Sequence, residues 1–264
     1  MSNQYHEYFT FDGVKSCDYG VWISGEATFN APERDVDVVE IPGRNGTLTL
    51  DNGRWKNVKV TYPCYMSGDF MSGFDAFKNA ILPKYGYLQL SDTYHPAGYR
   101  MARIYGGINP ETGPYNKSAK FDITFDCWPQ FYLKPAGSAY PDSVSITGGS
   151  GTINNIPTAS YSKPNVIMYV ASPTSYVNKS GSITVGDQTI TFTNLPYRST
   201  WATAVSINCE KKTITTRINA VTTDVSEYFE LTTGDWFSIV PPSTAVSYTG
   251  NVQNLLIQPF WWQL

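Results

Sequence analysis

The sequence predicts an all-β protein with one short helix, and three observations lead to that fold class. Aromatic residues make up 15% of the 264-residue chain and charged residues only 16%, a composition that suits pleated, half-buried sheets. The 21 Gly and 17 Pro separate short runs in which apolar and polar residues alternate, as they do in strands. Only one segment has the apolar period of a helix, so the remaining ordered chain is expected to be β.

The length and the charge distribution predict two domains. A chain of 264 residues is long for one small domain and fits two domains of about 130 residues each. Residues 1–133 hold 27 of the 41 charged residues, and Pro, Gly and Ser cluster just beyond, over Phe131–Asp142. Such a cluster is typical of a linker. We therefore predict an N-terminal domain over 1–133 and a C-terminal domain over 134–264.

The first domain is predicted to contain strands on both sides of the helix. The strands before the helix are Tyr8–Phe11, Val21–Ile23, Val36–Ile41, Leu48–Leu50 and Val58–Tyr65, and those after it are 86–92, Arg100–Tyr105 and Lys120–Pro129. The helix is expected over about 69–82, because Phe70, Phe74, Phe77 and Ile81 recur at the spacing of one helix face. Pro83 then ends it. This apolar stripe is interpreted as core packing against the sheet.

The second domain has no helical period and is predicted to be a β-sandwich. Residues 182–192 have the pattern of a hairpin in which Gly186-Asp187 supplies a two-residue turn. Residues 204–215 form a second hairpin around a loop at 210–212, and Val252–Pro259 is the last long strand. Regularly spaced short strands of this kind are typical of sandwiches.

Composition and motifs exclude several classes of function. The net charge of −3 offers no basic surface for nucleic acid, and no run approaches the roughly 18 apolar residues of a membrane span. The N-terminus lacks the features of a signal peptide, so we expect the chain to mature in a cytoplasm with reduced thiols. The spacing of Cys17, Cys64, Cys127 and Cys209 fits neither a disulfide framework nor a zinc motif.

No constellation of catalytic residues is apparent, and we predict no enzyme, no cofactor and no metal. Asp122 and Asp126 share one face of a predicted strand, as paired glycosidase carboxylates do, but a solvated polar face explains them equally well. His6 and His95 are the only histidines, so a Ser–His–Asp site would have to use His95.

Several motifs resemble those of one family. The N-terminal order is Phe9–Gly13, Asp18–Gly25, Pro32–Asp35 and a strand that stops at Ile41–Gly46; Tyr85–Asp92, Phe125–Pro129, Ser206–Glu210 and Leu231–Asp235 follow. This order resembles the siphophage distal tail proteins, components at the hub of a phage baseplate. The sequence departs from the family pattern at Ala80–Leu82, where a Trp-Leu pair is usual, and in its aromatic C-terminus, Pro259–Leu264.

The resemblance implies a structural protein of the virion tail tip, made in the host bacterial cytoplasm. Family members form a ring, usually a hexamer, from their N-terminal domains. The ring lies between the tail-tube protein and a tail-associated, hub or fibre protein. Their C-terminal domains are β-sandwiches of galectin or carbohydrate-module type, which hold receptor-binding proteins in some phages.

The segment Glu33–Gly46 is the candidate subunit interface. We expect Glu33, Arg34, Asp35, Arg44 and Asn45 to contribute, with Arg44 placed between two Gly-containing turns as a bidentate partner for a carboxylate. The neighbouring residues Val36, Val38, Val39 and Ile41 are expected to be able to bury. An ordinary hairpin with solvated charges is the alternative interpretation.

A carbohydrate-binding adhesin module is the alternative function. Trp201, Trp236, Trp261 and Trp262 lie in the predicted sandwich, and exposed indoles stack on sugar rings or contact partners, although tryptophans more often pack in cores. If Trp261 and Trp262 belong to one strand, they point to opposite faces, and one of them is then exposed or covered by a partner.

Overall fold

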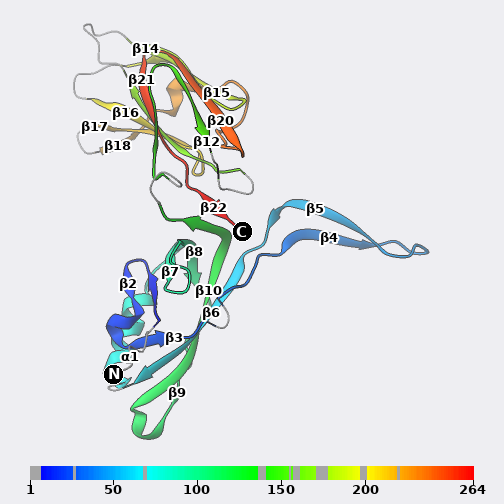
Figure 1. Ribbon diagram of the computed structural model, residues 1–264, viewed down its shortest axis with the longest axis vertical. Helices are drawn as coiled ribbons and strands as arrows, with labels where there is room; N and C mark the ends of the chain where they lie inside the picture. Colours follow the sequence, from blue (N-terminus) through cyan, green and yellow to red (C-terminus); the bar gives the residue numbers. More distant parts are fainter. Residues whose placement is uncertain are drawn as a thin grey trace. The chain divides into compact units, whose positions relative to one another are not determined.

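The computed structural model describes residues 7–25, 28–67, 70–135, 141–154, 156, 161–170, 178–196, 201–218 and 221–264. The chain divides into two compact units, Met1–Tyr132 with Leu264, and Leu133–Gln263. Figure 1 colours the chain continuously from blue at the N-terminus to red at the C-terminus, and each unit is described here by itself.

The first unit is built on one large antiparallel sheet. Its strands are β1 (Phe9–Phe11), β2 (Val14–Lys15), β3 (Val21–Ile23), β4 (Arg34–Glu40), β5 (Thr47–Trp55), β6 (Val58–Ser67), β7 (Leu88–Asp92), β8 (Gly98–Ile104), β9 (Glu111–Thr112) and β10 (Ser118–Leu133). The main path of the sheet runs β2-β1-β7-β8-β10-β6-β3, with β9 beside β10. The strands β4 and β5 form a separate two-stranded sheet.

Helix α1 (Phe70–Ile81) covers one face of the large sheet. The predicted stripe of Phe70, Phe74, Phe77 and Ile81 is buried, and the ring of Phe74 lies 5.2 Å from that of Phe121 on β10. The helix prediction is confirmed, although residue 69, its expected start, lies outside the described residues. Aromatic packing of the helix on the sheet therefore forms the core of this unit.

The side chains of the long strand pair β6–β10 alternate between an inner face of the sheet, toward the core, and an outer face. The two strands are antiparallel with Phe125 opposite Val60 and Asp126 opposite Lys59. Phe125 is completely buried on the inner face. The alternate residues of the same strands lie on the outer face, which brings Asp122, Thr124 and Asp126 to one side, as the sequence predicted.

The second unit is a β-sandwich of two antiparallel sheets. Its strands are β11 (Val144–Ile146), β12 (Ser150–Asn154), β13 (Asn165–Val170), β14 (Lys179–Val185), β15 (Gln188–Leu195), β16 (Trp201–Asn208), β17 (Thr213–Ile218), β18 (Val221–Asp224), β19 (Phe229–Leu231), β20 (Ser243–Gly250) and β21 (Val252–Gln258); the short strand β22 (Trp262–Gln263) follows and belongs to neither of the two sheets. One sheet has the order β11-β21-β13-β16-β17-β18 and the other β12-β20-β14-β15-β19. Apolar side chains of both sheets share one core cluster.

The two predicted hairpins of the sandwich are confirmed. Val185 and Gln188 pair across the turn at Gly186-Asp187, and Gly186 has a φ of 62°, which suits the first central position of a type II′ turn. In the second hairpin, Asn208 pairs with Thr213 across the intervening loop. The all-β fold class with a single α-helix is likewise confirmed for the described residues.

Candidate functional site

A hairpin arm, residues 34–55, extends away from the large sheet of the first unit (Figure 1). It consists of β4, β5 and the turn between them, and each strand pairs only with the other among the described residues. An isolated two-stranded hairpin is at best marginally stable in water. The arm therefore presents both faces and both edges to its surroundings.

The arm exposes aliphatic side chains, among them Val38 and Val39, which the sequence indicated could be buried at a subunit interface. Val39 pairs with Leu48 and Asp37 with Leu50, so Val39, Leu48 and Leu50 share one face and are 42%, 41% and 50% exposed. Val38 lies on the opposite face and is 59% exposed. Among the described residues no second layer covers these strands, and exposed aliphatic side chains gathered on one face are typical of interaction sites.

The predicted interface charges at the root of the arm are paired within it. Nε of Arg34 lies 2.9 Å from Oδ2 of Asp51, Arg54 binds Asp35 at 2.5 Å, and Lys56 lies 4.0 Å from Glu33. The hydrogen bond from Arg34, followed by that from the Gly53 amide, lowers the pKa of Asp51. Ion pairs near the surface contribute little stability each, but the first two join β4 to β5 and the third joins the residues that flank these strands.

Arg44 and Asn45 occupy the tip of the arm. Gly43 and Gly46 on either side have φ values of 79° and 83°, so the predicted turns are present, and the Arg44 amide donates to the Ile41 carbonyl at 3.2 Å. Both side chains are exposed and make no hydrogen bond or ion pair with any other residue that the structure describes. A guanidinium in this position is free to bind a carboxylate of another chain.

The root of the arm meets a buried carboxylate, a feature that sequence reasoning missed. Oδ2 of Asp126 accepts hydrogen bonds from Tyr87 Oη at 2.8 Å, Arg103 Nε at 2.9 Å and Asn57 Nδ2 at 3.1 Å. Burial acts to raise the pKa of Asp126, but the three hydrogen bonds outweigh it and hold that pKa below its ordinary value. An ionised, saturated carboxylate is not the general acid that a glycosidase needs.

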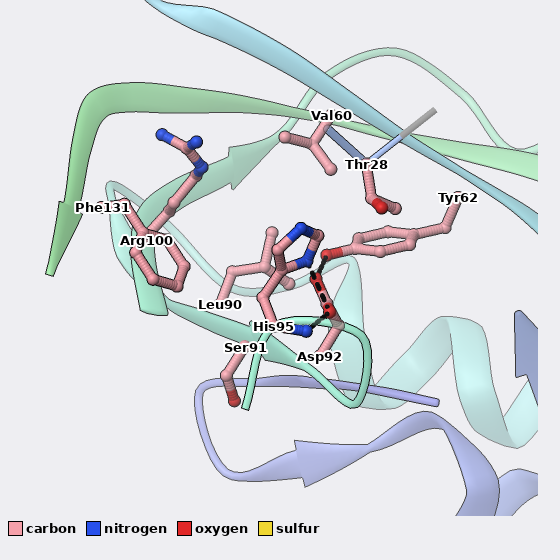
Figure 2. A pocket seen from close by; sticks show the side chains of 9 residues that line it. All are labelled: Thr28, Val60, Tyr62, Leu90, Ser91, Asp92, His95, Arg100 and Phe131. Atoms are coloured by element: carbon pink, nitrogen blue, oxygen red, sulfur yellow. Dashed lines mark hydrogen bonds and ion pairs between the residues drawn. The ribbon is translucent and has the colours of Figure 1, made fainter. Parts of the chain in front are cut away.

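The cavity in Figure 2 is small and lined by a second polar cluster. Asp92 accepts from Tyr62 Oη at 2.6 Å and lies 2.9 Å from His95 Nδ1. Burial, with the nearby Asp92 charge, raises the pKa of Tyr62 well above its ordinary value. The cavity measures about 20 Å³, room for about one water molecule, so this cluster holds the fold and leaves no space for an organic substrate.

Two of the predicted partner-facing tryptophans are buried. Trp261 is 4% exposed in the sandwich core and donates from Nε1 to the Pro141 carbonyl at 3.0 Å. Trp262 is 9% exposed and donates to the Tyr161 carbonyl at 2.9 Å. The condition for one of this pair to be exposed or covered by a partner, a shared strand, is not met, because Phe260 has a φ of 51° and β22 begins only at Trp262, so strand alternation does not apply.

The other two tryptophans leave the prediction untested. Trp236 is half-buried against the sandwich core, and the side chain of Trp201 lies outside the described residues.

No group of three or more His, Cys, Asp or Glu side chains within the described ranges has the arrangement of a metal site. A helix long and apolar enough to cross a membrane is also missing from the part of the chain that the structure describes.

Comparison with known proteins identifies the fold. No family model matches the chain, and no curated protein matches its sequence. Among solved structures, the chain is similar to the SPP1 Dit protein, described as a paradigm of the hub adsorption apparatus in phages that infect Gram-positive hosts. The TM-score is 0.70 at 12% identity, and 95% of this chain and 97% of that chain are covered.

Chains of the phage P2 baseplate are also similar. In the activated baseplate with Ca the TM-score is 0.55 at 9% identity, covering 96% of this chain and 97% of that one. In the form with Sr it is 0.56 at 10% identity, covering 96% of each. These matches confirm, at the level of the fold and over both units, the resemblance to phage distal tail and baseplate proteins predicted from the sequence.

Proposed function

We propose that this chain is a structural, non-enzymatic protein of a phage tail tip. Copies assemble through the first unit into a ring that connects the tail tube to the baseplate. The observation that carries the proposal is the arm, whose exposed apolar side chains are not covered by any other element that the structure describes. The full-length likeness to phage hub and baseplate proteins supports the same reading.

A projecting arm favours a ring over a symmetric pair. If the arm of one copy contacts a different surface on the next copy, the contact is heterologous, and heterologous contacts close into a ring when the rotation permits. The sequence resemblance to distal tail proteins implies six subunits. Arg44, with Asn45 beside it, is our candidate for a carboxylate of the neighbouring copy, because its guanidinium is exposed at the tip.

The remaining partners follow from the same resemblance. The ring is proposed to contact the major tail-tube protein on one side and a tail-associated, hub or fibre protein on the other. The sandwich, residues 134–264, is proposed as the attachment platform for a receptor-binding protein. Trp261 and Trp262 are buried and give no support to saccharide binding.

The first test is size-exclusion chromatography with light scattering, followed by electron microscopy of the main peak. A hexamer of the 29.4 kDa chain has a mass of about 176 kDa and should appear as an open ring. Arg44→Glu should reduce the ring fraction. Arg217→Glu, which alters an exposed arginine on β17 of the sandwich, serves as the matched control and should not. A monomer at every concentration would overturn the self-assembling ring.

A further inference from the structure

The direction of the arm is set where it joins the large sheet. The last strand of the arm, β5, ends at Trp55, and β6 begins at Val58, so only Lys56 and Asn57 connect the arm to the sheet on this side. The backbone of these two residues decides where the arm points. A side chain that fixes either of them therefore fixes the arm.

Asn57 is fixed by two hydrogen bonds although its side chain lies at the surface. Its Nδ2 donates to Tyr87 Oη at 2.8 Å and to Oδ2 of Asp126 at 3.1 Å. Asp126, which is 8% exposed, sits on β10 one strand away and also accepts from Arg103 on β8. We name Asn57, Tyr87, Arg103 and Asp126 the anchor. Its members come from the arm root and from three places around the large sheet.

The side chains of the anchor hold one another in place through hydrogen bonds and ring contacts. Three donors bind one oxygen of the Asp126 carboxylate, which is buried and held by its neighbours. Hydrogen bonds to an ionised acceptor are about twice as strong as those between neutral groups. The guanidinium of Arg103 also lies 5.3 Å from the ring centre of Tyr87, and Tyr87 packs 5.3 Å from Trp128. Asn57 thus binds to groups that are themselves held by the sheet.

Two segments, here called legs, connect the arm to the rest of the first unit, and the leg that precedes β4 is also held by hydrogen bonds near the large sheet. Asn30 Nδ2 donates to the carbonyl of Lys59 on β6 at 2.9 Å, and the Lys56 amide donates to the Glu33 carbonyl at 2.8 Å, which makes the last rung between the two legs. Both legs are therefore attached to β6 or β10, and neither attachment lies within the arm itself.

We infer that Asn57 is a positioning residue: held by the anchor, it keeps the arm in one direction relative to the large sheet before any partner binds. This inference rests on the proposed function, since a fixed arm matters because the arm makes the assembly contact. Preorganising a contact element lowers the ordering entropy lost on association. Variants that release the arm should therefore assemble less well while keeping the fold of the subunit.

The test measures the direction of the arm within one chain. Nitroxide labels at Thr49→Cys on the arm and Asn79→Cys on α1, both exposed positions, report one distance by pulsed electron paramagnetic resonance. The labelled protein is diluted into an excess of unlabelled protein so that only pairs within one chain contribute. Cys17 is replaced by Ser, while the buried cysteines 64, 127 and 209 stay, because burial raises the pKa of each thiol and suppresses its labelling.

Three variants separate the inference from its alternatives. Asn57→Ala removes the donor. Asn57→Asp keeps the shape but places a second carboxylate against Asp126. Asn52→Ala removes an asparagine that bonds only within the arm, to Asp37, and is the matched control. The distance distribution should widen about twofold in both Asn57 variants and stay at the wild-type width in Asn52→Ala, with unchanged circular dichroism in all three.

A wild-type width in Asn57→Ala would overturn the inference, and so would a wild-type distribution already as broad as that of the variant. These outcomes do not depend on the ring. If the wild type forms no ring, the proposed function fails while the distance measurement still decides whether Asn57 directs the arm. If rings form and Asn57→Ala leaves the distribution narrow, only the present inference fails.

Discussion

Replacing two leucines of the arm should weaken assembly without destabilising the subunit. In the variant Leu48→Ser/Leu50→Ser, both changes fall on the same exposed face. Leu48 and Leu50 are 41% and 50% exposed, so a partner that covers both would bury an area equal to about nine-tenths of one leucine side chain. Full burial of a leucine is worth about 1.5–3 kcal/mol. The variant should therefore lose about 1.4–2.7 kcal/mol at each contact, or about 10- to 100-fold in its association constant.

The assay is light scattering over a dilution series, which gives the concentration at which the assembly dissociates. The midpoint should move to higher concentration in the double variant, while the free energy of unfolding changes by no more than about 0.5 kcal/mol, as is usual for exposed positions. Val221→Ser is the matched control, since Val221 is 64% exposed on β18 of the sandwich. Equal dissociation midpoints for wild type and double variant, or an equal loss in the control, would refute the reasoning.

Three further predictions concern the described core and its titratable groups. Phe77→Ala, at a completely buried position, should lower the free energy of unfolding, measured by urea denaturation, by about 3–5 kcal/mol. A loss below about 1 kcal/mol would contradict the central place of Phe77 in the core. Asp126→Asn should cost about 1–3 kcal/mol at about pH 7. Because the pKa of Asp126 is lowered in the fold, this contribution exists above the ordinary Asp value of about 3.9 and disappears as the pH falls through the folded value, so denaturation near about pH 2 should show a smaller gap. With a chromogenic disulfide at about pH 8, Cys17 alone should react in the native protein, and the three buried thiols only after unfolding; a second fast thiol would count against their burial.

The elements predicted well from the sequence are those whose signal is local. Helix α1 follows from one apolar stripe and a terminating Pro83, and the β14–β15 hairpin from the turn at Gly186-Asp187, because periodicity and turn chemistry act over a few residues. The arm was predicted as strands for the same reason. Its Val and Ile residues were expected to be able to bury, but the sequence pattern alone does not say whether their own chain or another one covers them.

The residues that were missed are those brought together only by the fold. Asn57, Tyr87, Arg103 and Asp126 are far apart in sequence, and each alone has an ordinary reading as a surface polar residue or a strand aromatic. Their convergence depends on the strand order β8-β10-β6, which no single segment encodes. For Trp261 and Trp262 the cause is local instead, because the positive φ at Phe260 precedes a strand that begins only at Trp262, so the alternation rule does not apply to the pair.

The charges of the arm are better explained by specificity than by stability. The Arg34–Asp51 pair has side chains that are 39% and 49% exposed, and exposed ion pairs of this kind contribute little to stability. They do, however, oppose a shift in register, since a slip of one residue moves every side chain to the other face and would divide Leu48 and Leu50 from Val39. Cross-strand pairs thus keep Val39, Leu48 and Leu50 on one face, and Asn57 directs the arm that carries it. No element that the structure describes covers that face, as expected if the proposed assembly supplies the covering layer.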